Sequence, residues 1–389
     1  LALAAGACSG GERRPAAGGE LSGPPVVVGL INMEGAATGS FPELRKAAEA
    51  AAALVNRDLG GIGGRPLRIE ACASTGTPES SQGCAHRVLE SKPVAVMGGI
   101  DLGAGATLPV LKDAGVPYVS SSPTMPEELS SQGAFAFTGG TAADLLGQAE
   151  YVTATLKPAK VGILHMQLPG LLRSLPTLAR LVLNRRGVGE VKVVAEKADA
   201  ADFTPALKAV SANDPDVIFV VFPAQACARV LQAQQGLRVR ARLFFPSVCA
   251  DAAVVGPAGA AADGAYFSSG FLPFDDPDEA VATWRREQGS APVSVLAQAG
   301  FSTVMNLHGL IGALDGDELT PASVATRLEK ARDRDSFMGH PYSCDGKRAP
   351  LVTSACSVHV RILQHRGGRF SDVTGDWVSG ADLVKLLVG

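Results

Sequence analysis

The sequence predicts an α/β protein with two similar lobes, each a mostly parallel sheet flanked by helices. Short, valine-rich apolar runs alternate with longer amphipathic segments, which is typical of parallel strands buried between helices. The chain also has 389 residues, 46% of them hydrophobic, and this length exceeds what one hydrophobic core usually serves. We therefore expect two domains rather than one.

The expected elements follow one another in a regular order from Val26 onward. Strands are expected at residues 26–31, 67–72, 94–97, 116–120, 161–165, 191–195, 217–222, 243–245 and 265–267. Helices are expected at residues 41–58, 107–114, 145–155 and 225–235, and the pattern at residues 277–331 is mainly helical. Because the alternation pauses at residues 137–142 and then resumes, a second lobe is expected to begin there.

Composition and motifs argue against several classes of protein. The net charge of -3 comes from 35 basic and 38 acidic residues without a basic block, so we expect no nucleic-acid partner. The stretch "GAGATL" at Gly103 lacks the third glycine of a dinucleotide fingerprint. The histidines show no metal-ligand spacing, and no nucleophile elbow or Walker loop occurs. We therefore expect no enzymatic activity, no cofactor and no metal site.

The first residues, "LALAAGACSGGERRPAAGG", resemble the end of a bacterial lipoprotein signal. An apolar run closes in small residues immediately before Cys8, and a thiol at the first mature position can be acylated. The glycine, proline and alanine that follow up to Pro25 indicate a flexible tether. The alternative is an alanine-rich, unstructured N-terminus with a chance cysteine.

Longer stretches carry a resemblance to a known family. "VVVGLINMEGAATG", "NRDLGGIGGRPLRIEAC" and "PVAVMGGIDLGAGATLPVLKDAGVPYVSSSPTMPEEL" resemble, in order and spacing, the extracytoplasmic solute-binding proteins of branched-chain amino acid ABC transporters. "DPDVIFVVFPAQACARVLQAQQGL", "ADGAYFSSGFLPFDDPDEA" and "DGKRAPLVTSACSVHVRIL" continue it to about Phe370. The resemblance implies a type I periplasmic-binding fold that closes over a small ligand, with hinge crossovers near residues 138–142, 269–273 and 345–352.

These inferences define an expected domain organisation. It comprises the end of a signal peptide at residues 1–7, a lipidated Cys8 and tether at 8–25, a first lobe at 26–141 and 271–345, and a second lobe at 142–270 and 352–389.

Six further cysteines suit an oxidising compartment. Cys72 ends an expected strand and Cys84 lies on the next helix, so one bridge can join them. Cys227 begins a helix and Cys249 follows the next strand, which places both near one sheet edge. Cys344 and Cys356 flank a hairpin-like segment. We expect these three pairs to form disulfides, and the alternative is six buried free thiols.

A ligand is expected where strands of both lobes end, since ligands of open α/β sheets bind beyond the carboxyl ends of the strands. The corresponding loops are residues 32–39, 99–103 and 121–124 in the first lobe and 166–170, 222–225 and 247–251 in the second. The "SSSPT" run is the strongest candidate, although an ordinary Ser-Pro turn has the same sequence. The expected ligand-binding residues are Met33, Asp101, Leu102, Ser122, Thr124, Leu168, Phe222 and Ser247.

The family comparison is most informative where this chain departs from it. Ser122 and Thr124 match the amino acid binders, but Asp101 stands where they offer a hydroxyl to the ligand carboxylate. Ser247 stands where they hold the ammonium with an acidic residue, and Leu168 and Phe222 begin the places where they carry aromatic linings. We expect a neutral or cationic ligand with hydrogen-bond donors rather than a simple branched-chain amino acid. The alternative is that Asp101 caps the helix beginning near Gly103.

The sequence therefore predicts a monomeric, lipid-anchored, extracytoplasmic protein that delivers a small molecule to an ABC permease. A ligand sensor of the same fold without a transport role is the alternative, and an enzyme on an α/β scaffold is a distant one.

Overall fold

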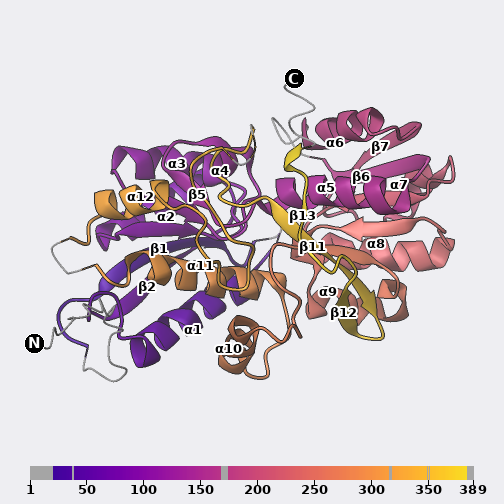
Figure 1. Ribbon diagram of the computed structural model, residues 1–389. Coiled ribbons are helices and arrows are strands. Elements are labelled where there is room, and N and C mark those ends of the chain that lie inside the picture. The colour runs from indigo at the N-terminus through magenta and orange to yellow at the C-terminus, as the bar shows by residue number, and fades with distance from the viewer. Residues whose placement is uncertain are drawn as a thin grey trace, which may run out of the picture.

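The computed structural model describes residues 21–36, 39–167, 174–314, 318–347, 349 and 351–382. In this part of the chain the strands form two separate sheets, one in each lobe of Figure 1. Cys8 and the rest of residues 1–20 lie outside the described residues. The described helices include none that is long and apolar enough to cross a membrane.

The first sheet is parallel throughout and has the order β2-β1-β3-β4-β5. Its strands are β1 (Val26–Met33), β2 (Leu67–Ser74), β3 (Ala95–Gly98), β4 (Tyr118–Ser120) and β5 (Ala134–Ala136). The connecting helices are α1 (Pro42–Asp58), α2 (Pro78–Glu90), α3 (Ala104–Asp113) and α4 (Pro126–Ser130). All eight β1 residues are buried, as expected for a central strand covered by helices on both faces.

Three later helices return to this first lobe, namely α10 (Glu279–Gln288), α11 (Val295–Ile311) and α12 (Pro321–Glu329). Helix α11 packs against α1, and Figure 1 shows the two helices together on the face of the sheet opposite α2 and α3. The close approach depends on Gly300, where a Cβ would lie 2.2 Å from the carbonyl oxygen of Leu44. The helical segment expected after residue 277 therefore completes the first lobe.

The second sheet has the order β12-β11-β10-β9-β8-β6-β7. Strands β6 (Lys160–Met166), β7 (Glu190–Glu196), β8 (Val217–Val221), β9 (Arg242–Phe245) and β10 (Tyr266–Ser269) are parallel. Antiparallel pairing adds β11 (His359–Arg366), β12 (Arg369–Asp372) and β13 (Val378–Ser379). The helices are α5 (Gly140–Tyr151) with a π-helical turn (Val152–Leu156), α6 (Ser174–Arg185), α7 (Thr204–Ser211), α8 (Ala224–Leu237) and α9 (Ala252–Ala258).

The predicted two-lobed α/β class is confirmed, and every expected strand is found with its ends within two residues. The sequence analysis missed β5, β11, β12 and β13. Strand β5 has only three residues. Strand β11 reads HVRILQHR, so polar residues interrupt its apolar run, and a search for continuous valine-rich runs does not find it.

The chain passes between the lobes after β5 and after β10, close to the first two expected crossings. The third crossing comes later than residues 345–352. The amide of Ala136 donates to the carbonyl of Ser354 at 2.9 Å, and the amide of Cys356 donates to the carbonyl of Ala136 at 2.7 Å. Residues 354–356 therefore still extend the edge of the first sheet, and β11 begins only at His359. The other lobe boundaries stay predictions.

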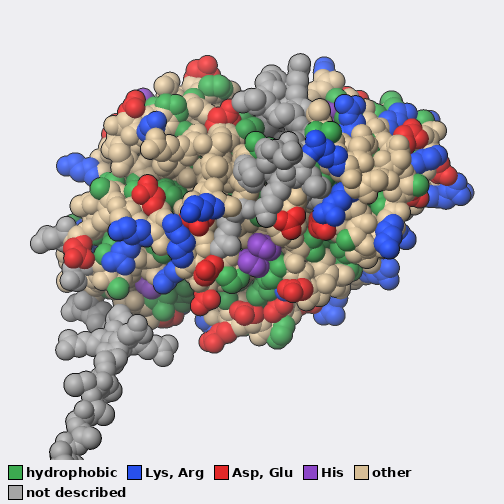
Figure 2. Space-filling model, turned by 45° about the horizontal axis from the view of Figure 1, so that its top comes forward, with side chains coloured by type: hydrophobic (Ala, Val, Ile, Leu, Met, Phe, Trp, Pro, Cys, Tyr) green, Lys and Arg blue, Asp and Glu red, His purple; other side chains and the backbone are tan. Residues whose placement is uncertain are grey.

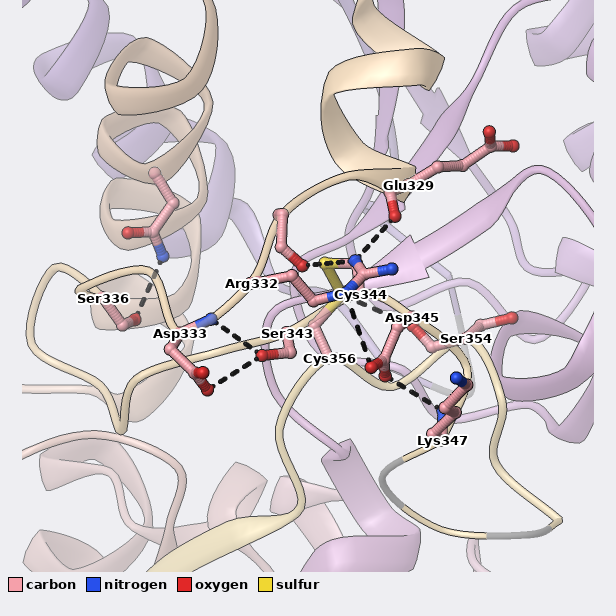
Figure 3. Close-up of a disulfide and its surroundings, with 12 residues drawn as sticks. Glu329, Arg332, Asp333, Ser336, Ser343, Cys344, Asp345, Lys347, Ser354 and Cys356 are labelled. Atoms are coloured by element: carbon pink, nitrogen blue, oxygen red, sulfur yellow. Dashed lines mark hydrogen bonds and ion pairs between the residues drawn. A yellow bond between two sulfur atoms is a disulfide. The ribbon is translucent and has the colours of Figure 1, made fainter.

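All three expected cysteine pairs are disulfides in the structure, Cys72 with Cys84, Cys227 with Cys249, and Cys344 with Cys356. The prediction of a hairpin between Cys344 and Cys356 was wrong, because the described residues between them form no paired strands. Figure 3 shows an irregular segment there. Arg332, which precedes the segment, lies 3.5 Å from the carboxylate of Asp345. The amide of Cys344 bonds to the carbonyl of Ala331, so this disulfide joins the end of α12 to the edge of the first sheet.

We expect removal of the Cys344–Cys356 disulfide by the Cys344→Ser, Cys356→Ser double variant to lower the free energy of unfolding by about 3 kcal/mol, the value for a short closed loop. Urea denaturation measures the change. The Cys72→Ser, Cys84→Ser variant is a matched control, since the sequence separation is 12 in both pairs. Alkylation of any of the six thiols in the folded, unreduced protein would contradict the pairing.

Charged side chains of both signs are spread over the surface. Figure 2 shows Lys and Arg side chains gathered toward the outer end of the second lobe, and Asp and Glu along the lower middle of the same face. This view shows no continuous basic stripe of the kind that follows a phosphate backbone.

Candidate functional site

A pocket of about 450 Å³ lies between the lobes. The first lobe lines it with Met33, Phe41, Ile100, Leu102 and Thr124, and the second with His165, Met166, Val221, Phe222, Pro246 and Val248, among others. Most of these residues end a strand or follow one directly. The pocket therefore lies where parallel α/β sheets bind ligands, at the carboxyl ends of strands from both lobes.

Asn32 fixes the backbone segments of the first lobe that line the pocket. Its side-chain amide donates to the carbonyl of Phe41 at 2.8 Å, and its side-chain oxygen accepts from the amide of Ile100 at 3.2 Å. The amide of Met33 also donates to the carbonyl of Ile100. The backbones that carry Met33, Phe41 and Ile100 are thus held together around the buried side chain of Asn32.

In the second lobe, Phe222 packs edge-on against Phe203 with ring centroids 5.1 Å apart. The guanidinium carbon of Arg229 lies 5.6 Å from the centroid of the Phe203 ring. Arg229 also donates a hydrogen bond to the carbonyl of Ala198 at 2.7 Å. Burial lowers the pKa of His165, so its imidazole is neutral at physiological pH. Lys197 and Asp199 are exposed and lie where the pocket meets solvent. Arg229 also lines the pocket and is partly buried, and its Nε atom has no hydrogen-bond partner among the described residues. The pocket lining is therefore mostly apolar, with one cationic side chain from α8.

Glu128 organises the "SSSPT" loop from beneath. One carboxylate oxygen accepts from the hydroxyls of Tyr118 at 2.9 Å and Ser120 at 2.7 Å. The other accepts from the backbone amides of Thr124 and Met125, each at 2.9 Å. Glu128 is fully buried, so this network fixes the backbone that carries Thr124 into the pocket. The sequence analysis missed Glu128, because no motif marks it.

Burial raises the pKa of Glu128 to about 7, and burial likewise raises the pKa of Glu43 to about 7, both from 4.5. Between pH 4.5, the ordinary pKa, and pH 7, the pKa in the folded protein, the folded state binds more protons than the unfolded state. The stabilisation is therefore complete below about pH 4.5 and is lost as the pH rises through 7. We expect each of the two groups to lower the free energy of unfolding by on the order of 2 kcal/mol between about pH 5 and pH 7.5. Urea denaturation against pH measures it, and an equally steep fall in Glu128→Gln would show that Glu128 is not responsible.

The prediction that the Asp101 carboxylate faces a ligand is not supported by the structure. Asp101 is 1% exposed and does not line the pocket. Its Oδ1 atom accepts from the hydroxyls of Ser81 at 2.6 Å and Ser74 at 3.0 Å and from the amide of Gly103 at 3.2 Å. Hydrogen-bond donors behind the loop thus hold the carboxylate just before α3. The N-cap residue of α3 is Gly103, without a side-chain cap, so Asp101 accepts from the amide of the N-cap residue without being the cap itself.

Ser122 and Ser247 line a separate, smaller recess instead of the pocket. The residues of this recess are Ser121, Ser122, Thr138, Gly139, Gly140, Ala143, Asp144, Ser247, Gly270, Phe271, Val295, His359 and Val360. Ser247 donates to Oδ2 of Asp144 twice, from its amide at 2.9 Å and its hydroxyl at 2.7 Å. A carboxylate is therefore present behind Ser247, supplied by α5 rather than by the loop after β9.

The outcome for the eight expected ligand residues is mixed. Met33, Leu102, Thr124 and Phe222 line the pocket, and Ser122 and Ser247 line the recess. Asp101 lines neither, and Leu168 lies outside the described residues. Contact of any of these residues with a ligand stays a prediction. The described residues contain no cluster of side chains suited to hold a metal ion.

A family model described as periplasmic binding protein matches residues 25–359. The chain belongs to this family. Its resemblance to the solute-binding proteins of branched-chain amino acid transporters, and the type I periplasmic-binding fold, are confirmed. No curated protein matches the chain by sequence.

Solved structures with the same fold carry varied names. A leucine binding protein from Thermotoga maritima has a TM-score of 0.76 at 15% identity, covering 92% of this chain and 99% of that one. A solute binding protein of an ABC transporter from R. palustris, in complex with benzoate, has a TM-score of 0.76 at 15% identity, covering 92% and 97%. A fatty acid ABC transporter substrate-binding protein from Thermomonospora curvata has a TM-score of 0.79 at 13% identity, covering 94% and 95%. These identities establish the fold and leave the ligand open.

Proposed function

We propose that this periplasmic binding protein captures a small, largely apolar molecule between its lobes and delivers it to an ABC permease. The observation that carries the proposal is the pocket of about 450 Å³, lined by mostly apolar side chains from both lobes. Pockets of this size and lining are typical of small-molecule sites. A ligand there contacts both lobes at once, so it stabilises the closed arrangement relative to an open one. The permease then recognises the closed surface.

The lining supports a ligand with an apolar body. Met33, Ile100 and Phe222 line the pocket with apolar side chains. Leucine, benzoate and fatty acid, the ligands named for the structural neighbours, all have an apolar part. We extend that shared property, and no more of their chemistry, to this chain.

We expect leucine, isoleucine and valine to bind weakly or not at all. Amino acid binders offer a hydroxyl at the position of Asp101, and here the Asp101 carboxylate is turned toward Ser74 and Ser81. The position therefore supplies no donor to a ligand carboxylate. Isothermal calorimetry at about pH 7.5 is the measurement, and micromolar binding of any of the three would show that this part of the proposal is wrong.

Attachment to the membrane through a lipidated Cys8 remains a prediction from the sequence, as does a monomeric state. The extracytoplasmic setting suits both the family and the three disulfides.

Native mass spectrometry of the protein purified from its own host tests capture directly. We expect a retained small molecule that is released on unfolding. A protein that carries no small molecule and binds none from a cell extract would contradict the proposal. Adjacent permease and ATPase genes would favour delivery, whereas an adjacent receptor or kinase gene would favour sensing.

A further inference from the structure

The recess that contains Asp144 adjoins the hinge side of the pocket. Three chain segments contribute neighbouring residues to both hollows. Ser247 lines the recess, while Pro246 and Val248 on either side of it line the pocket. Gly140 lines the recess and Thr141 the pocket. The SSSPT loop repeats this with Ser122 and Thr124, so the same three segments form walls of both hollows.

Asp144 gives the recess a negative charge without a cation to balance it. The side chain is 3% exposed, and the described residues form no salt bridge to it. Among the described residues, only Ser247 donates hydrogen bonds to it, and both reach Oδ2. Burial raises the pKa of Asp144 to about 6, so the carboxylate is mostly ionised at about pH 7.5. A buried carboxylate with so few partners is costly unless another donor reaches it.

A second polar group in the recess also lacks a partner. The hydroxyl of Ser121 is buried, with the residue 2% exposed, and it makes no hydrogen bond among the described residues. Most buried hydroxyls have a partner, so the unpaired hydroxyl of Ser121, which lines the recess, is able to bond to a group that enters it. His359 also lines the recess. Its Nδ1 atom lies within hydrogen-bond distance of the Ser357 hydroxyl, and its ring stacks on His340.

The size of the recess limits what can enter it. Its volume of about 10 Å³ is close to the space that one water molecule needs. It therefore admits one small polar group and not the body of a ligand.

We propose that the recess is a head-group subsite in which Asp144 and Ser121 bind a hydrogen-bond-donating group, an ammonium or a hydroxyl, at the end of the apolar ligand. The inference rests on the proposed capture of a small molecule in the pocket. It assigns selectivity to α5 and to the SSSPT loop, and it predicts discrimination against ligands whose head group is a carboxylate, since like charges repel strongly in a buried site.

Three probes with the same aromatic body test the head-group preference, namely phenethylamine, phenethyl alcohol and phenylacetate. By calorimetry at about pH 7.5 we expect the amine and the alcohol to bind at least about tenfold more tightly than phenylacetate, a difference of about 1.4 kcal/mol. Asp144→Asn is expected to weaken binding of the amine by at least about tenfold and to reduce the difference from phenylacetate. Ser121→Ala is expected to weaken both donors without loss of folding, because its hydroxyl has no partner to lose.

Matched variants separate the subsite from general effects of substitution. Asp101→Asn removes another buried carboxylate, one held behind the loop, and Ser211→Ala removes another unpaired hydroxyl, on α7. Both should leave the order of the three affinities unchanged. The subsite would be overturned by an unchanged affinity for phenethylamine in Asp144→Asn, or by phenylacetate binding as tightly as the amine. It would also be overturned if neither phenethylamine nor phenethyl alcohol bound to a protein that retains another molecule from its host. A protein that captures no small molecule at all would instead contradict the proposed function.

Discussion

Glu128→Ala is expected to lower the free energy of unfolding by about 4 kcal/mol, because it leaves a set of buried donors without an acceptor. The hydroxyls of Tyr118 and Ser120 and the amides of Thr124 and Met125 all donate to this one carboxylate. Since Glu128 is fully buried, water cannot replace the lost oxygens. Urea denaturation at about pH 7.5 measures the change.

Two neighbouring substitutions make this expectation specific. Glu127→Ala changes the same residue type one position earlier in α4, where the described structure gives its side chain no hydrogen bond for Oε2, and we expect a change below about 1 kcal/mol. Glu128→Gln keeps one acceptor oxygen but points an amide group at other donors, so it should fall between the two. A stability of Glu128→Ala within about 1 kcal/mol of the native protein would contradict the role given to this network.

The sequence predicts the fold well because its signal is local. A buried parallel strand needs a short run of apolar residues, so runs such as 26–31 and 217–222 can be recognised without knowledge of their neighbours. Strand β11 is placed by pairing with β10 and β12 instead, and its buried residues include the polar Gln364 and His365. Its polar residues therefore hide it from a search based on hydrophobicity.

The same distinction explains the result for the site. The loops that line the pocket could be predicted, because their position follows from the order of strands and helices. The direction of the Asp101 side chain could not, because it depends on Ser74 and Ser81, which lie 27 and 20 residues earlier in the chain. Asp144 was missed for a similar reason, since it reaches Ser247 across 103 residues. Polar networks of this kind are set by tertiary packing, which one sequence does not display.

Gly140→Ala is expected to have the other large effect, by disturbing the first crossing between the lobes. Gly140 has φ of +50° and begins α5, and its backbone lies directly against the SSSPT loop. A Cβ there would lie 2.0 Å from the carbonyl oxygen of Pro123 and 2.7 Å from its Cγ atom. The substitution adds this steric clash to the cost of the left-handed conformation, so we expect a loss of at least about 3 kcal/mol in the free energy of unfolding.

Gly115→Ala provides the matched control for the crossing, because Gly115 has φ of +68° and nothing within 4 Å of the position of a Cβ. It therefore incurs the backbone strain alone, about 1 kcal/mol. In Gly140→Ala the loop that carries Ser122 and Thr124 must also move away from α5. This movement displaces the recess relative to the pocket. We therefore expect Gly140→Ala to bind phenethylamine at least about tenfold more weakly than Gly115→Ala does. Equal stability and equal binding in the two variants would mean that the close contact between Gly140 and Pro123 does not fix the position of the SSSPT loop relative to α5.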